Sequence, residues 1–174
     1  EVYKDGQIYS QSYKIGKPDE PVKVIGKCSA EKHGTKVTFH PDPTIFEETV
    51  YDYDTLKQRL RETAFLTKGL RIVLSDARVD PVHTHEFHYA GGIKEFVTYL
   101  NKSKEALYPE VIYCEGTRDG VYVEVAMQHN DSYNDATYSF VNNIITPEGG
   151  THLAGFRNAL TKTFNTYARA NKIL

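Results

Sequence analysis

The segment that decides the fold spans residues 148–169 and reads EGGTHLAGFRNALTKTFNTYAR. Apolar side chains recur in it every three to four residues, the period of an α-helix with one apolar face. We therefore predict an amphipathic helix that begins after the Gly149-Gly150 pair, is capped by Thr151 and packs its apolar stripe back onto the chain. The stripe consists of Leu153, Phe156, Leu160, Phe164 and Tyr167.

The same helix predicts a cationic surface. No aspartate or glutamate occurs from Gly149 to Leu174, although the whole chain has a formal net charge of −2. A locally basic face favours an anionic partner, because phosphates attract such side chains without any sequence readout. The alternative is an ordinary solvated helix face. The cations outside the stripe are Arg157, Lys162, Arg169 and Lys172.

The composition is that of an ordinary globular protein. The 174 residues are enough for one large domain or two small ones, and the near-neutral charge does not indicate a nucleic-acid binder by itself. Cys28 and Cys114 are isolated, which favours two reduced thiols over a disulfide or a metal site. No apolar run reaches the ~20 residues that span a bilayer, and no signal peptide opens the sequence. We expect a soluble, cytoplasmic protein.

The first part of the chain predicts short strands and one helix. Asp5-Gly6 is typical of a hairpin turn, and residues 22–25 and 35–39 have the composition of strands. Residues 53–66 predict a helix, followed by a strand at 70–74. The polar segment 75–85 lacks periodicity, and we interpret it as a domain boundary.

The second part begins again with a strand at 86–89. A helix from Gly92 is predicted by apolar residues at the helical period. Strands at 111–115 and 121–127 flank a turn at residues 118–120, and another strand follows at 138–142. Together these elements predict an α+β fold with helices on one side of a sheet. The apolar positions of the second helix are Ile93, Phe96, Val97 and Leu100.

Three histidines raise the question of a metal site. His83, His85 and His88 could supply imidazole ligands to zinc, but no cysteine or paired carboxylate completes a shell. We interpret them as structural residues of a polar linker and a strand, and His152 as a capping or packing residue. No nucleophile constellation, GxxxxGK[ST] loop or GxGxxG motif is present. We therefore assign no catalytic residue and no metal ligand.

Longer motifs resemble a known family. The segments SFVNNI at 139–144 and PEGGTHLAGFRNALTK at 147–162 closely resemble a signature of the ATPase subunit of bacterial type IIA DNA topoisomerases. Further matches lie at GTKVTF (34–39), AFL (64–66), EFHY (86–89) with GGI (91–93), and YLN (99–101). The resemblance covers essentially the whole chain, and the pattern at 86–92 leans toward DNA gyrase over topoisomerase IV.

This resemblance implies a fold and a division of labour. Residues 1–79 would be the C-terminal part of a GHKL ATPase domain, and residues 80–174 the N-terminal part of a transducer domain that resembles domain 2 of ribosomal protein S5. Thr35 and Val37 would border the adenine of ATP, while Arg157 would face a cavity that DNA traverses, with Lys162, Arg169 and Lys172 extending that surface. ATP and magnesium are the implied cofactors of the parent enzyme. Its implied partners are a DNA duplex, the A subunit of gyrase and a second copy of the ATPase subunit.

The resemblance also implies an internal fragment. The magnesium-binding asparagine, the general-base glutamate and the glycine-rich lid of the family would precede residue 1, and the lysine that reaches the terminal phosphate would follow residue 174. We expect that this chain alone neither hydrolyses ATP nor binds it tightly. The alternatives are a fragment of the corresponding topoisomerase IV subunit, a non-enzymatic S5-like module that binds nucleic acid, and a structural dimerisation domain.

Overall fold

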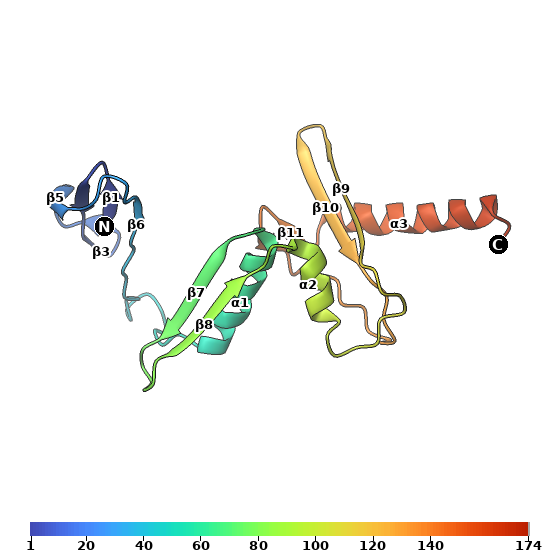
Figure 1. The fold of residues 1–174 in the computed structure, drawn as a ribbon, viewed down its shortest axis with the longest axis horizontal. Helices are drawn as coiled ribbons and strands as arrows, with labels where there is room; N and C mark the ends of the chain where they lie inside the picture. Colours follow the sequence, from blue (N-terminus) through green and yellow to red (C-terminus); the bar gives the residue numbers. More distant parts are fainter. Residues whose placement is uncertain (174) are drawn as a thin grey trace. The chain divides into compact units, whose positions relative to one another are not determined.

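The computed structural model describes residues 1–173 and divides into two compact units, the first of residues 1–52 and the second beginning at Tyr53. The first unit contains only strands, and the second contains helices and antiparallel strand pairs. The chain as a whole therefore has the predicted α+β class (Figure 1). Among the described residues, no helix has the length and apolar character needed to cross a membrane.

The first unit is a small antiparallel sheet with strand order β5-β2-β1-β6. Its strands are β1 (Val2–Lys4), β2 (Gln7–Ser10), β5 (Lys23–Lys27) and β6 (Gly34–Thr35), and a separate hairpin joins β3 (Tyr13–Lys14) to β4 (Lys17–Pro18). Asp5 and Gly6 have φ values of 51° and 75°, which is the left-handed geometry that a tight hairpin turn requires. The predicted turn is therefore confirmed.

The strand predicted at 35–39 is shorter than expected. β6 pairs with β1 through Gly34 and Thr35, and Lys36 exchanges two backbone hydrogen bonds with Glu1 before the chain leaves the sheet. The side chains of Val37 and Phe39 are 76% and 70% exposed, and Phe39 makes an edge-to-face contact with Tyr51, whose ring centroid lies 6.1 Å away. A strand needs a partner for its backbone groups, and local composition does not supply one.

The second unit begins with α1 (Tyr53–Leu66), which packs on the hairpin of β7 (Arg71–Asp76) and β8 (His83–His88) (Figure 1). The helix α2 (Gly92–Leu100) packs against α1 and against β10 (Val121–Met127), which pairs with β9 (Ile112–Arg118). Two short strands, β11 (Phe140–Val141) and β12 (Ile144–Ile145), precede α3 (Thr151–Ala170). The strands therefore form separate pairs instead of the single sheet that we expected.

The buried core lies where α1, β8 and α2 meet. Its fully or nearly buried apolar residues are Ala64, Phe65, Phe87 and Phe96. Phe65 stacks on Tyr89 with ring centroids 3.6 Å apart, and its centroid lies 5.0 Å from that of Phe96. The predicted periodicities of α1 and α2 are confirmed, because the apolar stripe of each helix faces this aromatic cluster.

The polar segment 75–85 differs from the prediction. It forms the ends of β7 and β8 and the turn between them, and the two strands pair from Arg71↔His88 to Asp76↔His83. The two compact units divide between Asp52 and Tyr53, and the boundary between residues 79 and 80 stays a prediction about the family's domains. The strand ends were missed because their outward side chains are polar and Pro81 suggested a break, while hydrogen bonds to the partner strand stabilise them.

Candidate functional site

The cationic helix α3 is present almost as predicted. It runs from Thr151 to Ala170, and Gly149 and Gly150 precede it with φ values of 73° and 150°. The predicted cap is wrong: Gly150 occupies the N-cap position, and no side chain caps the helix there. His152 does not cap the start of α3 either. Its Nε2 instead lies 3.2 Å from the hydroxyl oxygen of Thr146. That contact joins the start of α3 to the turn after β12.

The cations of α3 occupy two different sides of the helix. Lys162 and Arg169 are about two turns apart and share the side opposite the apolar stripe, whereas Arg157 flanks the stripe. Lys172 follows the helix with a φ of 55°. The structure therefore places Lys162 and Arg169 together, and it separates them from Arg157.

Arg157 has a partner in the chain. Its Nη2 lies 3.4 Å from a carboxylate oxygen of Asp135, and the side chains of the pair are 58% and 71% exposed. An exposed ion pair of this length is weak, because water and salt screen both charges. The guanidinium therefore remains accessible to an external anion, although Asp135 competes for it.

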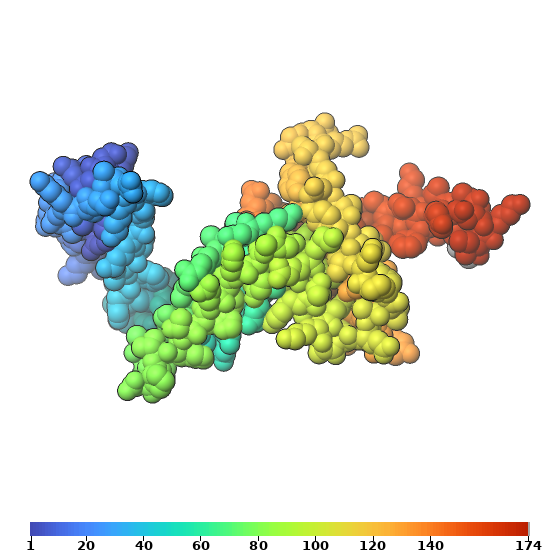
Figure 2. Space-filling view, viewed as in Figure 1, coloured from blue at the N-terminus to red at the C-terminus, as the bar shows by residue number. Residues whose placement is uncertain are grey.

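The apolar stripe of α3 is not packed as expected. Leu153, Phe156 and Leu160 are half-buried, whereas Phe164 and Tyr167 are 55% and 62% exposed. Among the described residues of this helix none is buried, and the space-filling view shows its side chains reaching solvent along its length (Figure 2). The prediction that the whole stripe packs back onto the chain is wrong, because no described element of the second unit covers its second half.

The residues proposed to border adenine lie in the first unit. Thr35 ends β6 opposite Val2, and Val37 lies beyond the strand with a 76% exposed side chain. The period-two alternation that would place both side chains on one face applies only within a strand. The structure therefore does not enclose Thr35 and Val37 in a common pocket.

Two of the three histidines, His83 and His85, pack against aromatic rings. The ring of His83 stacks on that of Tyr53 with centroids 4.6 Å apart, and the ring centroids of His85 and Phe87 are 4.5 Å apart. Burial lowers the pKa of His85, and the nearby charges of Lys57, Arg61 and His83 lower it further. Within residues 1–173 no group of three or more histidine, cysteine or acidic side chains has the geometry to hold a metal ion.

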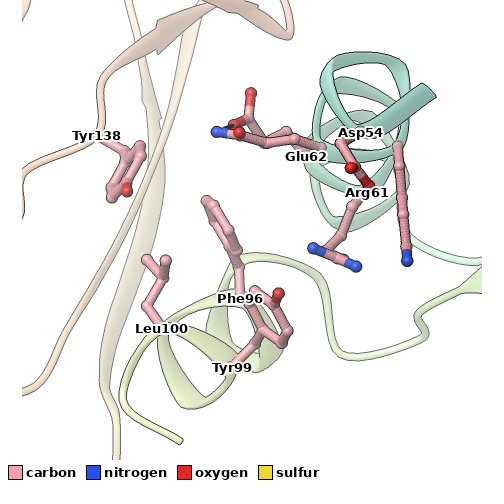
Figure 3. Close-up of a pocket in the computed structure, with 9 residues that line it drawn as sticks. Asp54, Arg61, Glu62, Phe96, Tyr99, Leu100 and Tyr138 are labelled. Carbon is pink, nitrogen blue, oxygen red and sulfur yellow. Dashed lines mark hydrogen bonds between the residues drawn. The ribbon is translucent and has the colours of Figure 1, made fainter. Parts of the chain in front are cut away.

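One cavity of the second unit was not predicted. It has a volume of about 380 Å³ and lies between α1, α2 and the segment before β11 (Figure 3). The Arg61 guanidinium carbon lies 5.0 Å from the centre of the Tyr99 ring, and the side chain of Glu62 is 9% exposed. Its lining residues are Asp54, Lys57, Gln58, Arg61, Glu62, Phe96, Tyr99, Leu100 and Tyr138.

The sequence alone could have predicted only part of the lining of this cavity. Lys57 and Arg61 are four residues apart, so one helix face with two cations could have been recognised. Phe96 and Tyr99 come from the next helix and Tyr138 from a distant loop, so their approach depends on tertiary packing. The lining balances two cations against two carboxylates, and we assign no ligand to it.

Comparison with known proteins identifies the relatives of this chain. The sequence model of the family described as DNA gyrase B matches residues 92–174. The chain is 55% identical to the B subunit of DNA gyrase from Clostridium acetobutylicum, over 97% of its own length and 26% of the relative's. It is 47% identical to the B subunit of DNA topoisomerase 4 from Streptococcus pneumoniae, over 100% of the chain and 27% of that relative.

A solved structure has the same fold over nearly the whole chain. The 43K ATPase domain of Thermus thermophilus gyrase B, determined with an aminocoumarin, superposes with a TM-score of 0.82 and 34% sequence identity. The match covers 99% of this chain and 47% of that one. The chain thus spans about a quarter of its first curated relatives and about half of this solved domain.

Proposed function

Since this chain belongs to the DNA gyrase B family, we propose that it forms part of the ATP-hydrolysing subunit of a type IIA DNA topoisomerase. The parent activity would be that of DNA gyrase, in which ATP binding drives the passage of one duplex through another. The observation that carries the proposal is the continuous similarity to gyrase B proteins along almost the entire chain. The role of this segment would be to couple ATP binding to DNA gating.

The two proposed domains divide that role. Residues 1–79 would complete the GHKL ATPase domain, and residues 80–174 would begin the transducer domain. The cations of α3 support a DNA-facing role for the second part, because Lys162 and Arg169 share one exposed side and no acidic residue accompanies them on the helix. The proposed partners are a DNA duplex, the A subunit of gyrase and a second copy of the gyrase B protein, and the cytoplasm is the proposed location.

ATP and magnesium are the proposed cofactors of the parent enzyme. The described residues do not fit a complete site for either, because Thr35 and Val37 are exposed and Lys36 between them is exposed and pairs with Glu1. Thr35 and Val37 would contribute to the adenine side of a pocket whose other walls come from elsewhere in the parent protein. We therefore derive no chemical step from the residues of this chain.

A supercoiling assay tests this function. The full-length protein that carries these residues would be purified, combined with the A subunit of gyrase and incubated with relaxed plasmid and ATP. Negative supercoils that require ATP would support the proposal. Decatenation of linked circles without supercoiling would instead support topoisomerase IV, which the similarity to the Streptococcus pneumoniae protein keeps as the second candidate. Absence of both activities would contradict a topoisomerase role.

A further inference from the structure

One lysine contacts three separate elements of the second unit. Lys68 lies in the turn between α1 and β7, and its Nζ is 2.9 Å from a carboxylate oxygen of Glu124 on β10. The same atom lies 3.3 Å from the hydroxyl of Tyr113 on β9. A single side chain thus spans from the end of α1 to both strands of the β9–β10 hairpin.

The path of this side chain depends on a glycine. A Cβ atom at Gly92, the first residue of α2, would lie 2.4 Å from Cε and 2.8 Å from Cγ of Lys68. Gly92 also has a φ of 61°, in the left-handed region. The aliphatic stem of Lys68 therefore crosses the start of α2 through space that any other residue would fill.

The end of this path is a cluster of like charges. Glu115 and Glu124 are directly opposite each other in the β9–β10 ladder, on the same face of the hairpin. Tyr113 donates a hydrogen bond to Glu124 at 2.6 Å, and Tyr122 donates one to Glu115 at 2.7 Å. Two neighbouring carboxylates repel each other, so a cation at this place stabilises the arrangement. Lys68 is the cation that makes an ion pair with Glu124 in the described part of the chain.

This contact differs in kind from the core of the unit. Phe65 is 1% exposed and joins α1 to Tyr89 and α2 through ring stacking, which cannot open without exposing apolar surface. The Lys68 and Glu124 side chains are 49% and 22% exposed, so water can replace their contact at small cost. Opening the core would therefore cost much more free energy than breaking the ion pair.

We propose that Lys68, crossing over Gly92 to Glu124, is a reversible latch that holds the β9–β10 hairpin in one orientation relative to the α1–β7 turn. The aromatic core around Phe65 acts as the fixed point about which the hairpin moves when the latch opens. If the latch helps to couple ATP binding to DNA gating, that role rests on the proposed function. The existence of the latch as a contact within this chain is independent of the proposed function.

Distance measurements between two spin labels test the latch in the purified chain. Cys114 is exposed on β9 and provides one label site, and Val73→Cys on β7 provides the other, in a Cys28→Ser background. We expect a single narrow distance distribution in the otherwise unchanged protein, and a distribution about twofold broader after Lys68→Met or Glu124→Gln. Unchanged widths in both variants would overturn the proposal.

Two matched controls separate the latch from general effects. Arg71→Gln removes an exposed ion pair of 2.7 Å with Glu86 that stays within the β7–β8 hairpin, so the distribution should remain narrow. Gly92→Ala should broaden it, whereas Gly120→Ala should not, because Gly120 has a similar φ of 77° but nothing within 4 Å of an added Cβ. The latch would be overturned if Arg71→Gln broadened the distance distribution as much as Lys68→Met, or if Gly120→Ala broadened it as much as Gly92→Ala.

The outcome is independent of the proposed function. The measurement uses neither nucleotide nor DNA, so unchanged distributions would refute the latch and leave the topoisomerase role untouched. Failure of the supercoiling assay would refute that role, and the spin-label result would still stand. Circular dichroism of each variant confirms that it is folded before its distances are compared.

Discussion

The ring of Phe65 lies nearly parallel to the ring of Tyr89, with centroids 3.6 Å apart and planes inclined by 12°. Phe65 belongs to α1, and Tyr89 lies between the end of β8 at His88 and the start of α2 at Gly92. The stacking therefore joins the last turn of one helix to the segment from which the next helix starts. Adding the contact with Phe96, a single buried ring holds three elements of the second unit together.

Phe65→Ala should destabilise the second unit by about 3–5 kcal/mol, because it removes a large buried ring and leaves a cavity that the helices cannot fill. Thermal unfolding monitored by circular dichroism measures the change. Phe164→Ala is the matched control, since that ring is 55% exposed on α3 and its loss should change stability by no more than about 0.5 kcal/mol. Equal destabilisation by the two substitutions would contradict the proposed core.

Lys162→Gln and Arg169→Gln should each weaken binding of the chain to a DNA duplex. Each removed charge should also reduce the slope of log affinity against log salt by about 1, because one fewer counterion is released. Fluorescence anisotropy of a labelled duplex at several salt concentrations measures both effects. Arg118→Gln removes an exposed charge from the β9–β10 turn and should leave the slope unchanged.

Asp135→Asn should strengthen the interaction of Arg157 with DNA. The carboxylate of Asp135 lies 3.4 Å from the guanidinium and competes with phosphate for it. The same anisotropy titration should therefore show tighter binding for Asp135→Asn and weaker binding for Arg157→Gln. If Asp135→Asn leaves the affinity of the parent chain unchanged and Arg157→Gln does too, Arg157 does not face the duplex.

The turn between β7 and β8 should lose stability in acid. The Arg78 guanidinium and its backbone N–H both donate to Asp76 and, with the nearby charge of His83, lower the pKa of this carboxyl from 3.8 to about 2. Because the folded pKa lies below the unfolded one, the stabilisation is complete above about 3.8 and is lost as the pH falls to about 2. NMR titration of the carboxyl measures the window, and hydrogen exchange of β8 amides should lose this acid dependence in Asp76→Asn.

A calorimetric titration of the chain alone with a non-hydrolysable ATP analogue should give no measurable heat of binding. Thr35 and Val37 are exposed, and Lys36 between them is exposed and pairs with Glu1, so a bound nucleotide would keep most of its surface in water. Thr35→Ala should therefore match the unchanged chain. Tight binding that Thr35→Ala weakens would show that phosphate-binding residues lie within these 174 residues.

Local patterns predicted most of the secondary structure. The stripes of α1, α2 and α3 have the helical period, and the hairpin turns at Asp5-Gly6 and Asp119-Gly120 carry residues that tolerate positive φ. The α+β class followed from these elements. Where the prediction was wrong, as at 75–85 and 35–39, the deciding factor was whether a second strand was available to accept the backbone hydrogen bonds.

The candidate site was predictable in part. The three cations of α3 and Lys172 after it were recognised because they lie in a segment without acidic residues, and the positions of the three around the helix follow from its period. The partner of Arg157 was not predictable, since Asp135 lies in an irregular loop whose path no periodicity describes. The cavity beside Arg61 was missed for the same reason, because Tyr138 approaches it from outside the two helices.

The sequence by itself determined which segments are helices, where the tight turns lie and which family the chain resembles, because each of these depends on residues within a few positions of one another. Only the tertiary structure decided that Lys68 crosses Gly92 to reach Glu124, that Phe65 joins α1 to α2, and that the second half of the α3 stripe is left uncovered. These contacts depend on how separate elements pack, and packing selects among many partners that the same local patterns allow.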